Sequence, residues 1–233
     1  MPLPKPTRTP TRWHWRCFVV ATVALLTATV PGRAQSSPPT AASIDSSSVG
    51  RVPYSRMHTT LEKTLLKVDV VNLDVWLGDE AAAGLEGIVS GERYSKELAD
   101  SVADIAMRSR DVFIRVEFLR NVNLGQFLDG ADDNLKRTLK VGVITEADYE
   151  MISAGMPVWY SFLEERGIRD GDVMRYRIRG DTLRTQFMSV EGELLMDQTD
   201  VGPERRRSVL GSYFVRKSDF REGLIKSLFG EGE

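Results

Sequence analysis

The chain has 233 residues, and its 31 Lys and Arg against 33 Asp and Glu give a formal net charge of −2, with only one Cys and two His. This composition excludes a disulfide framework and a Cys-ligated or His-rich metal site, and a mildly acidic surface does not suit nonspecific nucleic-acid binding. We therefore expect no metal, no cofactor and no nucleic acid as a partner.

The N-terminal stretch has the pattern of a secretory signal peptide. Four basic residues precede an apolar run from Cys17 to Val30, and Gly32-Arg33-Ala34 follows it. The pattern predicts a signal peptide over residues 1–34 with cleavage after Ala34, and hence a secreted or periplasmic protein. The run of 14 residues is short for a membrane span. We therefore expect no stable membrane insertion after cleavage, and an uncleaved anchor is the alternative.

The rest of the chain divides into a linker and a domain. Residues 1–34 contain five basic and no acidic residues, which leaves 26 basic against 33 acidic residues and a net charge of −7. Residues 35–52 are rich in Ser, Pro and Ala with almost no large apolar side chain, which predicts a disordered linker. Residues 53–233 are numerous enough to form one domain with a hydrophobic core.

Residues 56–77 are predicted to form β structure in which the alternation of side chains changes phase. The apolar residues occupy even positions from Leu66 to Val70 and odd positions from Val71 to Leu77. A strand with such a shift carries a bulge or a sharp bend, or crosses between layers of the core. A bulge would re-aim the side chains around Asp69 and Val70. The alternative is that the shift only lets the strand wrap around a core.

Two helices and a strand are predicted next. Residues 79–88 and 95–108 have apolar residues at helical spacing, and Ser95 is a candidate N-cap of the second helix. Residues 111–120 alternate between apolar and charged side chains, which predicts a strand.

Two further helices, a meander of strands and two C-terminal helices complete the predicted order. Apolar spacing from Leu124 to Leu139 marks one helix, and Thr145 begins another in which Pro157 is expected to cause a kink. Three short strands with hairpin turns follow between residues 172 and 198. A helix then begins at Gly202-Pro203, and Ser218 is expected to cap the last one. Clustered helices beside antiparallel strands define an α+β class.

Four stretches in this order resemble the chalcone isomerase-like domain family, specifically the bacterial secreted chalcone-isomerase-like proteins. They are LLKVDVVNLDVWL, FIRVEFLRNVNLGQFLDGADDN, DVMRYRIRGDTLRTQFMSVEGELL and GSYFVRKSDFREGLIKSLF. The resemblance implies a curved antiparallel sheet covered on one side by a layer of helices. It also implies a ligand cleft between sheet and helices, with the bent strand forming part of its wall.

The catalytic residues of true chalcone isomerases are only partly matched. By the resemblance, the family's tyrosine falls on Phe127, which has no hydroxyl, and its asparagine on Asn134. The threonine falls on Asp69, which adds a negative charge, and the arginine has no clean match, with Arg56 nearest. Because this chemistry depends on donors that stabilise developing charge, we do not expect chalcone cyclisation. An isomerase or intramolecular lyase with a rearranged site, for example with Asp69 as base, is an alternative.

Some members of the family bind fatty acids, with an Arg pairing the carboxylate inside an apolar cleft. A buried carboxylate needs such a partner, and Arg56, Arg115 and Arg175 are candidates that could equally be solvated or salt-bridged. The sequence therefore predicts non-catalytic binding of a small apolar or carboxylate ligand, such as a fatty acid. The candidate binding residues are Arg56, Asp69, Arg115, Phe127 and Asn134. A protein-interaction module without a ligand is the remaining alternative.

A group of Met and aromatic residues between positions 151 and 163 is open to two interpretations. It includes Met156, Trp159 and Tyr160. These side chains could line a ligand cleft, although residues of this kind at helical spacing more often pack in a core.

Overall fold

The computed structural model describes residues 54–63 and 68–230, without the side chains of residues 62, 63, 68 and 69. The predicted signal peptide (1–34) and linker (35–52) lie outside the described residues.

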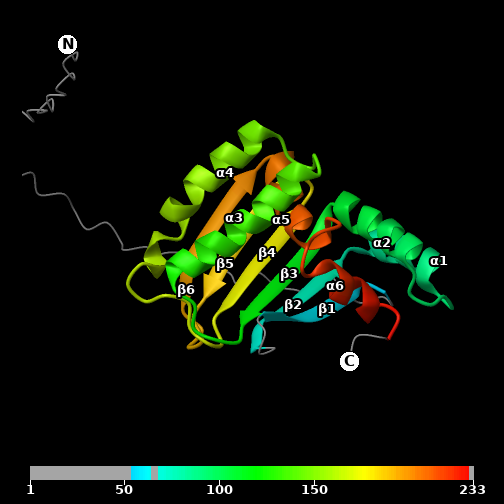
Figure 1. The fold of residues 1–233 in the computed structure, drawn as a ribbon, viewed down its shortest axis with the longest axis horizontal. Helices are drawn as coiled ribbons and strands as arrows, with labels where there is room; N and C mark the ends of the chain where they lie inside the picture. Colours follow the sequence, from blue (N-terminus) through cyan, green and yellow to red (C-terminus); the bar gives the residue numbers. More distant parts are fainter. Residues whose placement is uncertain (1–53, 64–67, 231–233) are drawn as a thin grey trace, which may run out of the picture. The chain divides into compact units, whose positions relative to one another are not determined.

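Within the described residues, six antiparallel strands form one sheet whose spatial order follows the sequence (Figure 1). This sheet and the accompanying helices confirm the predicted α+β class. The strands are β1 (Arg56–Lys63), β2 (Val68–Leu77), β3 (Asp111–Phe118), β4 (Val173–Arg179), β5 (Thr182–Met188) and β6 (Leu194–Val201).

The phase shift in the sequence corresponds to a bulge in β2. Leu61 of β1 pairs with Val71, and the next residue of β1 pairs with Asp69, so Val70 has no partner on β1. The carbonyl of Val70 instead accepts a hydrogen bond of 3.0 Å from the backbone N–H of Leu119, beyond the end of β3. A bulge of this kind bends a strand and increases its twist. The predicted β region 56–77 is thus two antiparallel strands, with the bulge in the second.

The helices begin largely where the sequence places their caps. Ser95 Oγ accepts from the N–H of Leu98, and Asn123 and Thr145 each form a complete capping box. The last helix departs from the prediction, since its N-cap is Phe220 and Ser218 Oγ only accepts the N–H of Phe220. The helices are α1 (Asp79–Val89), α2 (Lys96–Arg108), α3 (Leu124–Lys140), α4 (Glu146–Trp159), α5 (Pro203–Phe214) and α6 (Arg221–Ser227), with a 3₁₀ turn, η1 (Ser161–Leu163).

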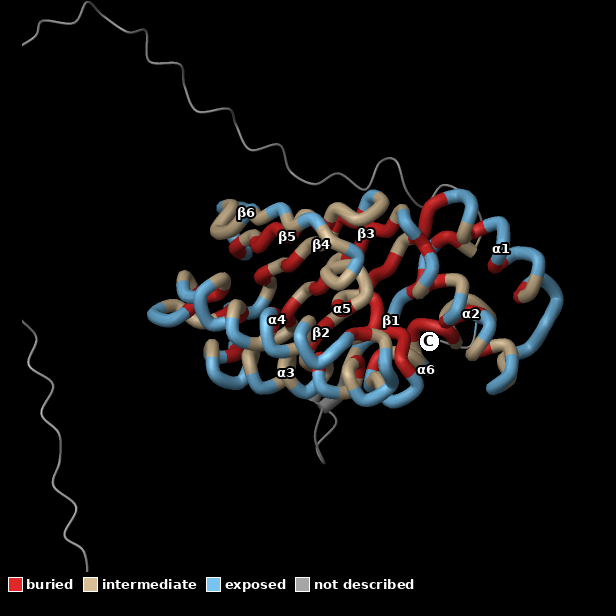
Figure 2. The backbone as a smooth tube through the Cα atoms, turned by 90° about the horizontal axis from the view of Figure 1, so that it is seen from above, coloured by how far each residue is buried: buried red, intermediate tan, exposed pale blue. Residues whose placement is uncertain are grey.

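The helices cover one side of the sheet, and Figure 2 shows β3 to β6 above α3, α4 and α5. The inward-facing residues of β2 and β3 are buried, among them Leu73, Val75 and Ile114. Each large apolar side chain removed from water contributes roughly 1.5–3 kcal/mol. Burial of this apolar face therefore holds the helices against the sheet.

The other face of the sheet carries charged and aromatic side chains. Arg56 donates to Asp74 at 2.8 Å, and Arg115 donates to Glu117 at 3.1 Å. Trp76 packs on Phe113 with ring centroids 5.2 Å apart. Since residues of opposite parity face the helices, the sheet separates a polar side from an apolar side.

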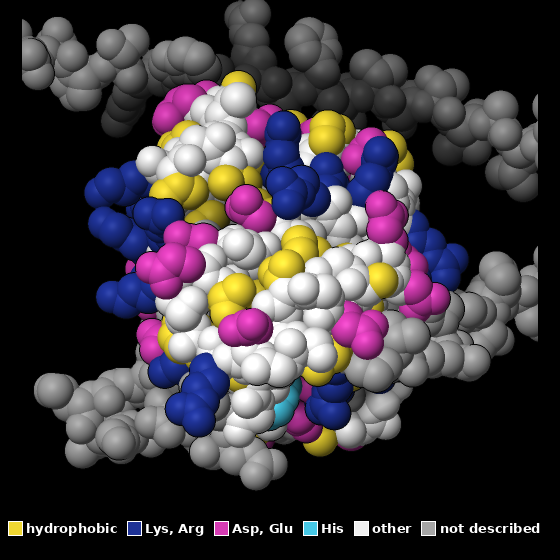
Figure 3. Space-filling model, turned by 90° about the vertical axis from the view of Figure 1, so that its right-hand side faces the viewer, with side chains coloured by type: hydrophobic (Ala, Val, Ile, Leu, Met, Phe, Trp, Pro, Cys, Tyr) yellow, Lys and Arg dark blue, Asp and Glu magenta, His cyan; other side chains and the backbone are white. Residues whose placement is uncertain are grey.

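Charges of both signs also alternate at the end of the molecule formed by α1, α2 and α6. Figure 3 shows basic and acidic side chains interspersed on this face. Asp100, for example, accepts hydrogen bonds from both Arg216 and Arg221. Such mixing suits a solvated surface more than a nucleic-acid footprint.

Candidate ligand-binding cavity

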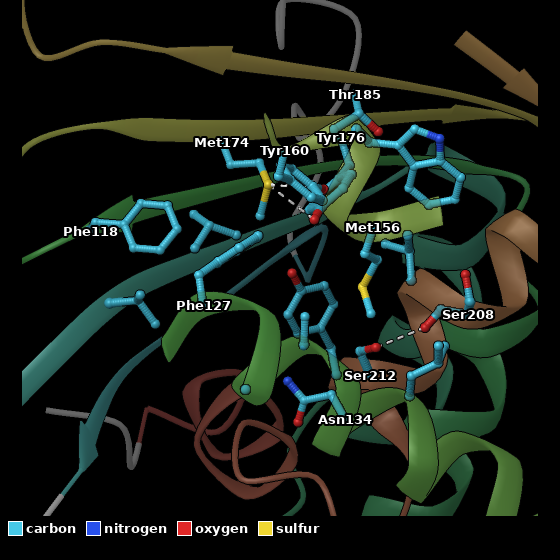
Figure 4. Close-up of a pocket in the computed structure, with 18 of the residues that line it drawn as sticks. Phe118, Phe127, Asn134, Met156, Tyr160, Met174, Tyr176, Thr185, Ser208 and Ser212 are labelled. Carbon is cyan, nitrogen blue, oxygen red and sulfur yellow. Dashed lines mark hydrogen bonds between the residues drawn. The ribbon is translucent and has the colours of Figure 1, made fainter. Parts of the chain in front are cut away.

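A cavity of about 390 Å³ lies between the inner face of the sheet and helices α3, α4 and α5. Its volume is within the range of small-molecule sites in proteins. In Figure 4, Phe118 and Phe127 lie towards one end of it and Ser208 and Ser212 towards the other. The cavity therefore has the position that the sequence resemblance implies for a ligand cleft.

Strand alternation and the bulge together form the sheet wall of the cavity. Val116 and Phe118 line it from β3, and Met174 and Tyr176 line it from β4. Both residues at the phase shift, Val70 and Val71, line the cavity as well. Two consecutive residues of a regular strand face opposite sides, so the bulge adds one apolar side chain to the wall.

Helix α3 contributes Phe127 and Asn134, which lie seven residues apart and hence on one helix face. The Phe127 ring packs edge-on against Tyr160, with centroids 4.8 Å apart. Asn134 Oδ1 accepts from Arg137 Nη1 at 2.9 Å. Its amide nitrogen makes no hydrogen bond to the described part of the chain, so two donors remain available at the cavity wall.

Three tyrosines form a polar cluster in the apolar wall. The hydroxyls of Tyr160 and Tyr176 both donate to Met174 Sδ, at 3.8 and 3.2 Å, and the Tyr176 hydroxyl also interacts with those of Tyr160 and Tyr213. Burial raises the pKa of Tyr160 to about 12 and raises the pKa values of Tyr176 and Tyr213 well above their usual range. At neutral pH all three hydroxyls are therefore protonated and able to donate.

Arg120 supplies a cation at the end of the cavity nearest the bulge. It lines the cavity two residues beyond Phe118, and its Nε atom is buried without a hydrogen-bond partner. Among residues 54–61 and 70–230, no carboxylate pairs with its guanidinium. The hydrogen bond between Leu119 and Val70 continues the antiparallel register, so we infer that the backbone of Asp69 runs beside Arg120.

The end of the cavity formed by α5 and β6 holds a second, already partnered cation. The guanidinium of Arg205 lies over the Trp159 ring, 4.7 Å from its centroid, and its Nε is 3.9 Å from Asp200. Asp200 also accepts from Gln198 at 3.0 Å. Arg205 is therefore held by the protein itself, in contrast to Arg120.

The structure brings together only part of the predicted site. Phe127 and Asn134 line the cavity, as do Met156, Trp159 and Tyr160 of the helical segment. Arg56 and Arg115 do not reach it, because their strand positions have the parity that faces away from the helices, where Asp74 and Glu117 bind them. Arg175 pairs in register with Arg115 and shares that face. Asp69 lies in β2, but its side chain is not described.

Among the described residues, no group of three or more His, Cys, Asp or Glu is placed to hold a metal ion. In the same part of the chain, no helix combines the length and the apolar character that crossing a membrane requires.

A sequential antiparallel sheet with a one-sided helical cover and a cavity between them defines the chalcone isomerase-like fold. The crystal structure of a fatty-acid binding protein from Arabidopsis thaliana is similar, with a TM-score of 0.54 over 78% of this chain and 92% of that chain. The two sequences are 16% identical, so the similarity establishes the fold alone. No protein-family model and no curated protein sequence matches the chain.

Proposed function

We propose that this domain binds a small amphipathic acid, such as a fatty acid, in the cavity beneath its sheet, and that it does so in a secreted or periplasmic protein. The N-terminal pattern over residues 1–34 supports export. The fatty-acid binding protein from Arabidopsis thaliana, which shares the fold, supports the class of ligand.

Arg120 is the observation that carries the proposal. An apolar cavity favours the chain of such a ligand, but a carboxylate entering it must exchange water for a charged or hydrogen-bonding partner. Arg120 lines the cavity with its Nε buried, and no described carboxylate neutralises it. A ligand carboxylate at this position would satisfy both the cation and the buried donor.

Substitution of Arg120 tests the proposal directly. Hydrogen bonds to charged groups contribute about 1.5–3 kcal/mol, so Arg120→Gln should weaken binding of a long-chain fatty acid by roughly tenfold to a hundredfold. Calorimetric titration of the chain that begins at Gln35 measures the affinity for the fatty acid. Arg56→Gln is the matched control, because Arg56 lies on the opposite face of the sheet and is largely exposed. Equal affinities for the wild type and both variants would contradict the proposed site.

Substitution of Asp69 provides a second test of the same site. The backbone of Asp69 runs beside Arg120, and a carboxylate there would compete with the ligand for the guanidinium. Asp69→Asn should then tighten fatty-acid binding, and the gain should vanish when Arg120→Gln is present. A gain that persists in the double variant would show that Asp69 acts independently of Arg120.

A further inference from the structure

The hydroxyl groups of the tyrosine cluster in the cavity wall contact one another and the thioether of Met174. Tyr160 and Tyr176 both direct their hydroxyl protons at the thioether of Met174, which is a weak acceptor. A stronger acceptor, such as a carbonyl oxygen, can replace a thioether as the partner of a phenol. The cluster is therefore suited to receive an acceptor atom from outside the protein.

Thr185 adds a buried hydroxyl to this cluster. It lies directly opposite Tyr176 in the β4–β5 register, lines the cavity and is only 6% exposed. A hydroxyl that lines the cavity beside two tyrosines that contact a sulfur is placed to donate to a ligand oxygen.

The electrostatics of the cluster favour an uncharged oxygen. No cationic side chain is among its members, and burial is the main reason that the tyrosines resist ionisation. The charge of Asp200 raises the pKa of Tyr160 further, and it would oppose a ligand carboxylate for the same reason. A carbonyl oxygen accepts hydrogen bonds from neutral donors without this cost.

The cluster is also well separated from Arg120. Tyr176 pairs with Ile114, four residues and hence about 13 Å before the end of β3 at a rise near 3.3 Å per residue, and Arg120 lies beyond that end. The cavity wall between them is apolar, formed by Val116, Phe118 and Met174. In Figure 4, Tyr160, Tyr176 and Thr185 lie together on the sheet side, away from Phe118. One polar group of a ligand cannot occupy both places.

We propose that the ligand is an acyl chain with two oxygen-bearing groups. Its carboxylate binds Arg120, and an uncharged carbonyl oxygen further along the chain accepts hydrogen bonds from Tyr160, Tyr176 and Thr185. This inference rests on the proposed function and specifies its ligand class. An unsubstituted fatty acid fills the apolar part of the cavity but leaves the cluster without an acceptor.

A series of oxo fatty acids tests the inference against their unsubstituted parent of the same chain length. Calorimetric titration should show that an acid with its carbonyl at one position far from the carboxylate binds roughly tenfold more tightly than the parent. Each good hydrogen bond contributes up to about that factor. Tyr176→Phe and Thr185→Val should each reduce this preference, measured as the ratio of the two affinities, by more than they change the affinity for the parent. Thr185→Ser, which retains the hydroxyl, should keep the preference.

The matched control is Tyr149→Phe, because the Tyr149 hydroxyl donates to Asp132 and the residue does not line the cavity. This variant should keep both affinities. Binding of the parent without a gain from a carbonyl at any position would overturn the inference and leave the proposed function standing. Loss of both affinities to the same extent in Tyr176→Phe would assign the cluster a structural role and also overturn it. Failure of every acid to bind would refute both proposals together.

Discussion

Asp172 is a fully buried carboxylate, and its hydrogen bonds fix the segment that leads into β4. It accepts two bonds from Arg166, at 2.7 and 3.1 Å, and one each from the backbone N–H groups of Arg169 and Val190. These partners belong to the loop before β4 and to the β5–β6 turn. The backbone carbonyl of Asp172 also accepts from Phe118, so the network borders the end of the cavity that contains Arg120.

Removing this charge should destabilise the fold. Asp172→Asn keeps the size of the side chain but leaves Arg166 without its carboxylate, and breaking a buried pair of this kind costs about 3 kcal/mol. Denaturant unfolding should show a lower midpoint. Asp170→Asn, at an exposed neighbouring position, should change stability by less than about 0.5 kcal/mol. A midpoint for Asp172→Asn equal to that of the control would refute the role of the network.

The same carboxyl makes stability depend on pH. Burial opposes ionisation of Asp172, but the hydrogen bonds from Arg166 and from the two N–H groups outweigh it and lower its pKa below 3.8. Since the pKa is lower in the folded than in the unfolded state, the stabilisation is complete above about pH 3.8 and is lost as the pH falls through the folded value. As the pH falls below about 3.8, wild-type protein should lose stability more steeply than Asp172→Asn, as acid titration of the unfolding midpoint would show.

Arg120 differs from Arg56 and Arg115, the arginines predicted from the sequence, in the face of the sheet to which it belongs. Phe118 belongs to the apolar face of β3, and Arg120 lies two residues further on with the same parity, whereas Arg115 has the opposite parity. The alternation in the sequence therefore contained the signal for Arg120. The position of the family's arginine led to Arg56 instead, which lies on the face of the sheet away from the helices. Asn134 was predicted from the resemblance, and it lines the cavity with Phe127 because the two residues lie two helical turns apart in α3.

At the scale of the elements, the close approach of α3 and α5 forms the floor of the cavity. Gly211 of α5 faces Thr138 of α3, and a Cβ atom at Gly211 would lie well inside van der Waals contact with Thr138 Cγ2. Thr138 is fully buried and its hydroxyl donates to the carbonyl of Asn134, so it has little freedom to move. The crossing depends on the absence of a side chain at residue 211.

Gly211→Ala should therefore destabilise the protein by about 1–3 kcal/mol, although alanine favours helices, because it overpacks the crossing. Gly87→Ala is the control. Gly87 lies in α1 with open space around it, and the same change there should stabilise by roughly 0.5–1 kcal/mol. Thermal unfolding of both variants measures the difference, and a stabilising effect at residue 211 would contradict the described packing.

Local elements could be predicted where neighbouring residues determine them. The bulge at Val70 follows from the alternation of β2, and the capping box at Thr145 joins residues three apart. The tyrosine cluster could not be predicted in this way. Tyr160 directly follows α4, Tyr176 lies in β4 and Tyr213 lies in α5. The three side chains therefore come together only when both helices pack on the sheet.

At the scale of the whole molecule, occupation of the cavity should raise thermal stability. A ligand that binds only the folded state contributes about 2.7 kcal/mol at a hundredfold excess over Kd. For a domain of this size the gain corresponds to an increase in Tm of roughly 5–10 °C. Differential scanning fluorimetry should show this shift with a long-chain fatty acid for the wild type and Arg56→Gln. The shift should be smaller for Arg120→Gln, and equal shifts in all three would argue against Arg120 as the partner.

The overall architecture followed from the order of elements, because antiparallel strands without crossover helices between residues 173 and 197 leave few arrangements of the sheet. The polar face of the sheet could be predicted only in part. Alternating arginines in β3 and β4 indicated a polar face. Which face the helices cover depends on tertiary packing of apolar residues such as Leu73 and Ile114.

The sequential order of the strands also has a consequence for the folding pathway. β4, β5 and β6 are joined by short turns, and β1 and β2 are adjacent in sequence, but β3 is separated from both its partners by pairs of helices. Non-local pairing delays folding, since the entropy of loop closure is lost before any contact forms. We expect β3 to join two earlier-forming groups of strands in the slow kinetic phase. Because β3 leads directly into Arg120, the cation would reach its place only as that last closure occurs.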